Sequence, residues 1–374
     1  MASPDVIVVG AGIVGAACAM ACARDGLRVA VVEAEMIGGG ATAAGMGHLV
    51  VMDDAEAQFA LTKYSVELWR GLAPELPGDA EFFPCGTIWV AADEKEMEFV
   101  RRKHEYYTSR GVRAEVLDAK ALANAEPHLR AGLAGGLLVP DDSVIYPPCA
   151  ARHLVDSAVA KGGSVEVGKR VASIRKGSVQ LDDGSEITGG CVINAAGIAA
   201  PSLTEGLEIK PRKGHLVITD RYDHMVRHQL VELGYLTSAH GSSNESTAFN
   251  VQPRPTGQLL IGSSRQYGAR DGAIEQRMLR PMLERARTFI PDAGEISAIR
   301  SWTGFRAATP DKLPYIGRTE ADEKLFIAAG HEGLGITTSL GTAELIVDEI
   351  MGRAPKIPPA PYRPERAFNH AAKN

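Results

Sequence analysis

Long apolar runs are missing from this 374-residue sequence, which has no stretch of about 18 apolar residues that could span a bilayer as a helix. A signal peptide is not expected either, because Met1–Asp5 carry no basic side chain and glycines interrupt the apolar stretch that follows. The sequence therefore predicts a cytoplasmic protein without a transmembrane segment. It leaves open peripheral contact with the inner membrane face through an electron acceptor.

Basic side chains are not in excess, since 40 Lys and Arg stand against 46 Asp and Glu, giving a formal net charge of −6. Nucleic-acid-binding proteins usually carry a basic excess or stripe, so we expect no nucleic-acid partner. With 45% hydrophobic and 23% charged residues, the composition is typical of a soluble globular protein. The length predicts two or three domains, or one large α/β body with an inserted domain.

Cysteine is scarce, and no two of the five cysteines have the CxxC spacing typical of zinc and iron–sulfur sites. An odd number of cysteines without a signal peptide also argues against a disulfide framework. Cys18 and Cys22, one helical turn apart in an Ala-rich segment, are expected to be small buried side chains that face a sheet. We therefore expect no metal site in this chain.

The N-terminal region has a pattern typical of dinucleotide binding. The β-branched run Asp5–Val9 predicts a buried strand, and the GxGxxG sequence Gly10–Gly15 follows at once. The Ala-rich segment Ala16–Asp25 predicts a helix, and Leu27–Val32 predicts a second buried strand that ends at Glu33. This order of strand, turn, helix and strand is the context that the glycine motif requires.

The residues of this motif have separate physical roles. Gly10 allows the tight turn, Gly12 lets the backbone approach a pyrophosphate, and Gly15 lets the helix pack against the strand. The N-terminus of the helix stabilises the phosphate charge. Glu33 is placed to accept a hydrogen bond from a ribose 2′-OH, and its charge would repel the 2′-phosphate of NADP.

Two further glycine-rich segments favour FAD over NAD. The first, Gly38–Gly47, follows directly after Glu33, and its part from Gly40 to Met46 can lie along the pyrophosphate and the flavin. The second, Gly330–Gly335, opens a helix predicted over Ile336–Met351. The positive end of that helix can face the N1–C2=O region of a flavin and stabilise its anionic reduced form.

Helical and strand patterns continue through the rest of the chain. We predict helices over 53–73, 93–110, 146–161 and 273–289, buried strands over 83–92, 191–197 and 325–329, a meander over 164–186 with a turn at Asp183-Gly184, repeated strands over 215–264, and an extended surface strap from Pro355. Nucleotide-binding patterns therefore occur near the start, the middle and the end of the chain.

This distribution predicts an α/β + β fold in which a second domain interrupts the nucleotide domain twice. We predict a Rossmann-like FAD-binding domain formed by residues 1–80, 147–212 and 306–374. An inserted antiparallel-sheet substrate domain would consist of residues 81–146 and 213–305.

The sequence resembles the D-amino acid oxidase/glycine oxidase (DAO) family of FAD-dependent oxidoreductases over nearly its whole length. The segments that carry the resemblance follow the family's order: Gly10–Gly15, Gly40–Met46, Asn194–Gly197, Trp302–Arg306, Thr309–Gly317 and Gly330-His331. The resemblance implies the GR2-type variant of the FAD-binding fold. It also implies cofactor contacts at Gly10, Gly12, Ile13, Val14, Gly15, Glu33, Ala34, Gly40, Ala41, Thr42, Gly45, Met46, Gly47, Val171, Ala195, Ala196, Gly197, Arg306, Gly330, His331, Gly333, Leu334, Gly335, Ile336 and Thr337, with Val171 near the adenine through its backbone.

Arg306 matches the family's arginine that binds the substrate carboxylate. A guanidinium group holds a carboxylate bidentately and can fix the α-carbon above flavin N5. Asn250 stands where the family's oxidases often have an active-site tyrosine, and an amide can hydrogen-bond a substrate but cannot carry a proton. His48, Tyr235 and Tyr267 are further candidates for the pocket.

Other segments resemble the FAD-bearing β subunits of heteromeric dehydrogenases, a subgroup that includes D-hydroxyproline dehydrogenase, opine oxidase and L-proline dehydrogenases. They are Pro211–Thr219, Leu260–Gln266 and His331–Gly335. The resemblance implies partner subunits, one of which bears an iron–sulfur centre and others of which are small. Some relatives hold FMN at a subunit interface, which would place it near His215 here.

We therefore predict an FAD-dependent enzyme that dehydrogenates a C–N bond next to a carboxylate, with D-hydroxyproline as the favoured substrate and a pyrroline carboxylate as the product. Arg306, Asn250 and His48 are its candidate catalytic residues. Two alternatives stay open: a stand-alone glycine or D-amino acid oxidase, and a non-catalytic subunit that relays electrons through FAD. Arg306 argues against the second, because a relay needs no carboxylate anchor.

Overall fold

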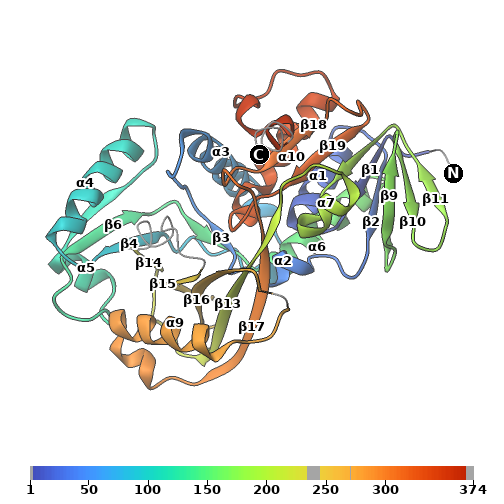
Figure 1. Ribbon diagram of the computed structural model, residues 1–374. Helices are drawn as coiled ribbons and strands as arrows, with labels where there is room; N and C mark the ends of the chain where they lie inside the picture. Colours follow the sequence, from blue (N-terminus) through green and yellow to red (C-terminus); the bar gives the residue numbers. More distant parts are fainter. Residues whose placement is uncertain (1–2, 234–244, 270, 368–374) are drawn as a thin grey trace.

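The computed structural model describes residues 3–233, 245–269 and 271–367, and within these residues two large sheets dominate the molecule (Figure 1). One belongs to an α/β layer that contains the N-terminus, and the other is a mixed, mainly antiparallel sheet. The predicted α/β + β architecture, with a second and mainly antiparallel sheet beside a parallel one, is confirmed.

The α/β layer is built on a six-stranded sheet. Its strands, in spatial order, are β18 (Tyr315–Arg318), β19 (Leu325–Ala329), β12 (Cys191–Asn194), β1 (Val6–Val9), β2 (Val29–Glu33) and β8 (Ser164–Val167). Neighbouring strands are parallel except for β18, which runs antiparallel to β19. The apolar run of β1 is buried on both faces, as expected for a central parallel strand.

Successive residues of β1 point to opposite faces of the sheet and enter different cores. Val6 and Val8 pack in a core with helices α1 (Ile13–Arg24), α6 (Pro147–Ala160) and α10 (Gly335–Ile350). On the other face, a three-stranded antiparallel sheet contributes to the core that contains Ile7 and Val9; its strands are β9 (Val171–Arg175), β10 (Ser178–Leu181) and β11 (Glu186–Thr188). Cys18 and Cys22 of α1 are fully buried in the first core, as predicted.

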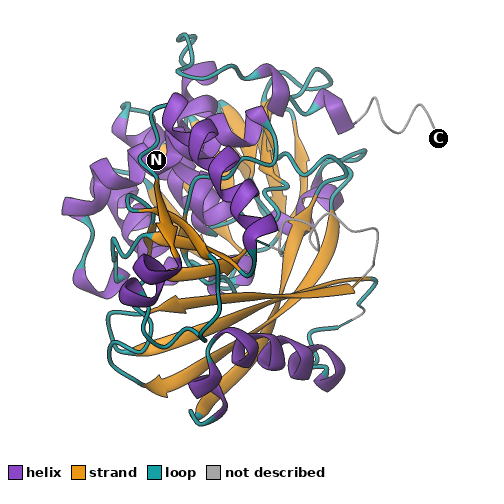
Figure 2. Ribbon diagram, turned by 90° about the vertical axis from the view of Figure 1, so that its left-hand side faces the viewer, coloured by secondary structure: helices purple, strands orange, loops and turns teal. Residues whose placement is uncertain are grey.

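The second large sheet has eight strands. In spatial order they are β17 (Ala298–Ala308), β13 (Lys210–Arg221), β16 (Gln258–Tyr267), β15 (Glu245–Pro253), β14 (Gln229–Glu232), β4 (Thr87–Ala91), β6 (Gly135–Val139) and β5 (Glu115–Asp118). Helix α9 (Gln276–Phe289) covers one face (Figure 2). There Phe249 stacks on Phe289. The other face is turned toward the α/β layer and lines the main cavity.

The remaining elements connect the two sheets or cover their edges. They are α2 (Gly40–Ala43), β3 (His48–Leu49), α3 (Glu56–Leu72), α4 (Glu94–Ser109), α5 (Ala119–Ala125), β7 (Ser143–Val144) and α7 (Ala200–Leu203), with short 3-10 turns at 73–75, 78–80, 197–199, 291–294 and 360–362. Strands β3 and β7 pair with each other and link the two parts of the fold. The predicted domain boundaries stay a prediction, and β13 and β17 run across those placed at 212/213 and 305/306.

Two predictions about local structure were wrong. The segment Ser164–Val167 was expected in the meander, but as β8 it extends the parallel sheet beside β2, and the antiparallel strands begin at Val171. The C-terminal segment was expected as an extended surface strap, but it contains a 3-10 turn and buries Tyr362 and Ala367. The Tyr362 hydroxyl donates to the carbonyl oxygen of Ala57, which ties the tail to α3.

Candidate active site

A cavity of about 810 Å³ lies between the two large sheets. Its lining includes Val9, Glu33, Ala195 and Ala329, which lie at or just beyond the carboxyl ends of β1, β2, β12 and β19. Ligands of open α/β sheets bind at this edge. The opposite wall comes from the eight-stranded sheet, so the cavity joins a nucleotide-type site to a second surface.

Close backbone packing forms the turn between β1 and α1. Gly10 has a φ of +99°, and a Cβ atom there would lie 2.7 Å from the carbonyl oxygen of Ala195. A Cβ atom on Gly15 would lie 2.0 Å from the carbonyl oxygen of Gly10. Gly10 lines the cavity, whereas Gly15 lies behind it and brings the helix against the strand, as its predicted role requires.

The start of α1 is joined to the second glycine-rich loop. The backbone N–H of Ile13 donates to Thr42 Oγ1 over 3.0 Å, and Thr42 is buried. Glu33 accepts hydrogen bonds from the N–H groups of Ala11 and Glu35, each over 2.7 Å. Since each carboxylate oxygen has a second lone pair, Glu33 keeps the capacity to accept a ribose hydroxyl.

Most of the residues predicted to contact the cofactor line this one cavity. They are Gly10, Gly12, Ile13, Val14, Glu33, Ala34, Gly40, Ala41, Thr42, Gly45, Met46, Gly47, Val171, Ala195, Ala196, Gly197, Arg306, Gly330, His331, Gly333, Leu334, Gly335 and Ile336. Gly15 and Thr337 do not line it. Thr337 is buried, and its hydroxyl donates to the carbonyl oxygen of His48 over 2.8 Å, so it supports the wall from behind.

Helix α10 begins at the cavity. Gly335 and Ile336 in its first turn line the cavity, so the positive end of the helix faces the cavity. His331 precedes this turn, and its Nε2 lies 3.0 Å from Thr342 Oγ1. Burial lowers the pKa of His331 to about 3, so this imidazole is neutral and does not compete for the negative charge of a ligand.

Arg306 on β17 reaches across the eight-stranded sheet into the cavity. Its Nη1 donates to the carbonyl oxygen of Ser264 on β16 over 3.0 Å, and the guanidinium group lies over Gly214 of the intervening β13. Burial lowers its pKa to about 10, and the nearby Arg212 contributes to that shift. Among the described residues Arg306 forms no salt bridge, so its charge remains available to a carboxylate.

Two more arginines line the cavity beside Arg306. Arg212 is ion-paired with Glu332 and donates to the hydroxyl of Tyr267 over 3.2 Å. Burial, together with the charges of Arg306 and Arg212, lowers the pKa of Arg265 to about 9, against the opposing effect of Glu332 and Asp54. Asp54 also lines the cavity, so the three arginines lie near two carboxylates, those of Glu332 and Asp54. The net positive charge of this group favours an anionic ligand group.

The predicted residues Asn250 and His48 lie in the same lining. Asn250 Oδ1 and His48 Nε2 are buried, and neither has a hydrogen-bond partner among the described residues. Burial, together with the charge of Arg306, lowers the pKa of His48 to about 4, so its imidazole is neutral near pH 7. Tyr267 is 40% exposed and bonded to Arg212, and Tyr235 lies outside the described residues.

The sequence patterns missed several polar residues of the lining, namely Gln58, Trp89, Arg212, Gln229, Ser263 and Arg265. Five of these lie on strands of the eight-stranded sheet, and for all of them except Trp89 a polar side chain on an inward face would have been the signal. Trp89 lies in the short apolar strand β4, whose residues are all buried, so alternation gives no indication of its face.

His215 lies on β13 but does not line the cavity. It is buried, its Nδ1 lies 2.9 Å from Ser264 Oγ, and its Nε2 accepts the N–H of Glu275 over 3.1 Å. Both ring nitrogens are therefore engaged within this chain. The FMN contact expected at His215 stays a prediction.

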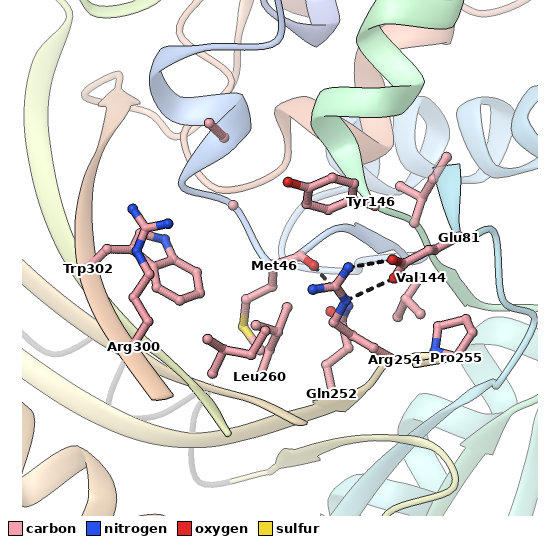
Figure 3. A pocket seen from close by; sticks show the side chains of 14 residues that line it. Met46, Glu81, Val144, Tyr146, Gln252, Arg254, Pro255, Leu260, Arg300 and Trp302 are labelled. Atoms are coloured by element: carbon pink, nitrogen blue, oxygen red, sulfur yellow. Dashed lines mark hydrogen bonds and ion pairs between the residues drawn. The ribbon is translucent and has the colours of Figure 1, made fainter. Parts of the chain in front are cut away.

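A smaller cavity of about 150 Å³ lies behind the second glycine-rich loop (Figure 3). Met46 lines both cavities. Gln252 Nε2 donates to the carbonyl oxygen of Met46 over 2.8 Å, and Arg254 is bonded to both carboxylate oxygens of Glu81 over 2.8 and 2.5 Å. The loop at Met46 is thus held from the eight-stranded sheet as well as from its own layer.

The main cavity fits FAD. A glycine turn, an acid at the end of β2 and the N-terminus of α10 line one long space, and seven of the buried polar atoms without a partner among the described residues belong to side chains of its lining. These atoms require a bound group to satisfy them. In the described part of the chain, three or more metal-binding side chains do not gather anywhere, and no helix is long and apolar enough to cross a membrane.

Comparison with known proteins agrees with this interpretation. The model of the DAO family, described as FAD dependent oxidoreductase, matches residues 5–349. The chain belongs to the DAO family. The prediction of an FAD-dependent oxidoreductase of the amino acid oxidase and dehydrogenase class is confirmed, as is FAD as its cofactor.

Individual DAO relatives have different activities in their names. The chain is 28% identical to glycine oxidase from Geobacillus kaustophilus over 96% of both chains. It is also 28% identical to D-amino acid dehydrogenase from Xanthobacter autotrophicus, over 80% of this chain and 71% of the relative. The crystal structure of glycine oxidase from G. kaustophilus superposes with a TM-score of 0.87 at 26% identity, covering 97% of this chain and 98% of that one. L-Proline dehydrogenase from P. horikoshii also gives 0.87 at 24% identity, over 99% and 98%, which is evidence for the fold.

Proposed function

We propose that this DAO-family chain dehydrogenates the C–N bond of an amino acid with a free carboxylate, and that its favoured substrate is D-hydroxyproline. The observation that carries the proposal is the Arg306 guanidinium, which lies in the FAD cavity without a salt-bridge partner among the described residues. A buried arginine that faces a ligand space is a strong and specific site for a carboxylate.

The residues around Arg306 define what the site does to a substrate. Arg306 would bind the carboxylate and thereby hold the α-carbon in one orientation, so positioning supplies much of the rate. Bound FAD would supply the two-electron acceptor. The substrate would lose hydride from its α-carbon while the nitrogen lone pair forms the C=N bond, and the nitrogen would then release its proton, which gives a pyrroline carboxylate from a cyclic substrate.

A strong base near Arg306 is not needed for this reaction, provided that the amine enters neutral. Asn250 carries no ionisable group, and His48 has its pKa lowered to about 4 by burial and by Arg306. Both side chains can instead offer hydrogen-bonding atoms to the substrate, since Asn250 Oδ1 and His48 Nε2 have no partner among the described residues. Their proposed roles are therefore binding and orientation.

We further propose that the chain is the catalytic β subunit of a heteromeric complex, in which a partner with an iron–sulfur centre receives the electrons. The support comes from the segments Pro211–Thr219 and Leu260–Gln266, which resemble such subunits, and from the absence of a CxxC pair in the sequence. Asn250 in place of the oxidases' tyrosine also favours a dehydrogenase.

The second candidate is a stand-alone glycine or D-amino acid oxidase. It is favoured by the glycine oxidase from Geobacillus kaustophilus, which aligns with the chain over nearly the full length of both. A non-catalytic relay subunit is disfavoured, because Arg306 would then have no role in the cavity.

The test is anaerobic bleaching of the flavin by D- and L-amino acids, prolines and opines, followed by admission of air. We expect rapid bleaching by D-hydroxyproline, slow reoxidation by air and co-purification of small Cys-rich subunits. Fast stoichiometric peroxide production by a lone chain would favour the oxidase. If no compound bleaches the flavin, the non-catalytic electron-relay subunit would be the remaining candidate.

A further inference from the structure

Three polar side chains surround one apolar residue on the floor of the cavity, the face of the eight-stranded sheet that lies toward the α/β layer. Val231 of β14 pairs with Trp89 of β4 on one side and with Asn250 of β15 on the other. Gln229 lies two residues before Val231 on the same strand, and therefore on the same face. All four residues line the cavity.

Each of the three polar side chains has one buried atom without a partner among the described residues: Trp89 Nε1, Gln229 Oε1 and Asn250 Oδ1. The residues are 2%, 2% and 7% exposed, so water in bulk does not satisfy these atoms. A buried donor or acceptor left unpaired costs about 1–3 kcal/mol. The cluster thus presents one donor and two acceptors around an apolar centre.

The distance from Arg306 to this cluster matches a small cyclic substrate. The Arg306 guanidinium reaches Ser264 on β16, and Val231, the centre of the cluster, lies two strands across the sheet from there, about 10 Å at the usual strand spacing. Val231 is level with Gly262 through Asn250, and Gly262 lies two residues from Ser264, so an offset of about 7 Å along the strands brings the separation to roughly 12 Å. Standard bond lengths place the carboxylate carbon of a five-membered ring roughly 4–5 Å from the oxygen of a hydroxyl group across that ring. One hydrogen bond of about 3 Å at each end extends this to about 10–11 Å, close to the separation between the two positions.

We propose that Gln229, with Asn250 and Trp89, binds a hydroxyl group on the substrate ring opposite the carboxylate. The hydroxyl would donate to Gln229 Oε1 or Asn250 Oδ1 and accept from the Trp89 N–H, while Val231 contacts the ring carbons. These are specificity-determining residues, and the inference rests on the proposed function because it deepens the substrate class of that same site.

Such a cluster discriminates mainly by what it rejects. A ring without the hydroxyl leaves the buried polar atoms unpaired, and sites built for a hydroxyl reject the analogue that lacks it by up to about 10⁴- to 10⁵-fold. We expect at least a 100-fold preference of kcat/KM for 4-hydroxy-D-proline of one C4 configuration over D-proline.

The decisive experiment measures binding and turnover separately. Calorimetric titration of the FAD-loaded protein would compare 4-hydroxytetrahydrofuran-2-carboxylate, in both C4 configurations, with tetrahydrofuran-2-carboxylate; these rings lack the nitrogen and cannot react at a C–N bond. Gln229→Met removes the acceptor at nearly constant volume, and Gln229→Glu retains an acceptor. Gly71→Ala, at a position of α3 where a Cβ atom would meet nothing within 4 Å, is the control outside the cavity. Anaerobic flavin bleaching by 4-hydroxy-D-proline and D-proline supplies the turnover arm.

We expect wild type to bind one hydroxylated ring at least tenfold more tightly. Gln229→Met should lose that preference, whereas Gln229→Glu and Gly71→Ala should retain it. Equal binding of the hydroxylated and plain rings by wild type, or an unchanged preference in Gln229→Met, overturns the inference. If no cyclic amino acid bleaches the flavin while the binding preference persists, the proposed function fails and the hydroxyl site stands.

Discussion

Arg306 can reach its place over β13 because residue 214 has no side chain. A Cβ atom on Gly214 would lie 2.5 Å from Arg306 Nη1. The clashing atoms are the far end of a flexible side chain, so Gly214→Ala should displace the guanidinium and leave the fold intact. We expect unchanged FAD content and an approximately tenfold or greater rise in the substrate dissociation constant, measured by anaerobic titration of the flavin spectrum.

Gly71→Ala is the matched control for this substitution, because a Cβ atom at this position of α3 would meet nothing within 4 Å. This variant should bind substrate like wild type. If Gly214→Ala also binds substrate normally, the arginine does not hold the carboxylate from its position over β13.

Arg306→Lys tests the geometry of the guanidinium group rather than its charge. Lysine keeps the positive charge but cannot make two parallel hydrogen bonds to a carboxylate. Losing one charge-assisted bond costs about 1.5–3 kcal/mol, so kcat/KM should fall roughly 10- to 150-fold. Steady-state kinetics with an artificial electron acceptor measures this, and retention of wild-type kcat/KM would remove Arg306 from the proposed site.

At the residue scale, the sequence was informative where a motif has a fixed chemistry. Arg306, Glu33 and the glycine segments could be predicted because each occurs within a recognisable pattern. Trp89 and Gln229 could not, because their contribution depends on the pairing of β4 with β14, which are far apart along the chain. Strand register of this kind is set by tertiary contacts rather than by local sequence.

At the scale of elements, the C-terminal segment supports the helices around the nucleotide site. Tyr362 is 1% exposed, packs with the core that contains α1 and α10, and donates its hydroxyl to Ala57 at the start of α3. Replacement of a buried aromatic side chain by alanine costs about 3–5 kcal/mol. We therefore expect Tyr362→Ala to lower the free energy of unfolding by this amount in urea titrations.

Tyr362→Phe serves as the control, since it keeps the ring and loses only the hydrogen bond to Ala57. Its cost should be about 1 kcal/mol. Equal and small effects of both substitutions would mean that the tail contributes little to the stability of the core.

The two wrong predictions about elements share a cause. Both β8 and the tail at Tyr362 have local patterns that also occur in other structure, and their placement depends on distant partners: β8 pairs with β2, and Tyr362 bonds to α3. In contrast, β19 was predicted at its observed bounds, because an uninterrupted apolar run leaves no alternative to a central strand.

At the scale of the whole molecule, buried titratable groups make stability depend on pH in opposite directions. Burial lowers the pKa of His331 to about 3, and burial with Arg306 lowers that of His48 to about 4. Both would bind protons near pH 6.5 when unfolded, so stability falls as pH drops from about 6.5 toward 4. Burial raises the pKa of Asp142 to about 7. Because the folded state keeps this proton more tightly than the unfolded chain, the free energy of unfolding decreases as pH rises from about 4 to 7.

Asp142→Asn separates these effects. Asparagine can still accept the N–H of Val51 but has no charge to bury, so the opposing contribution disappears. The stability difference between variant and wild type should grow by about 1.4 kcal/mol per pH unit between pH 4 and 7, and remain constant above. Urea unfolding across this range measures it, and a difference independent of pH would contradict the raised pKa.

The residues that line the FAD cavity extend along the sequence from Val9 to Ile336, so part of its wall comes from α10, near the C-terminal end of the chain. A ribosome adding about 5–20 residues per second would expose the glycine turn roughly a quarter of a minute to a minute before α10 emerges. Throughout this time the growing chain lacks the wall of the cavity that the start of α10 supplies. Cofactor capture is therefore an event of the finished polypeptide, and fragments that stop before α10 should emerge colourless.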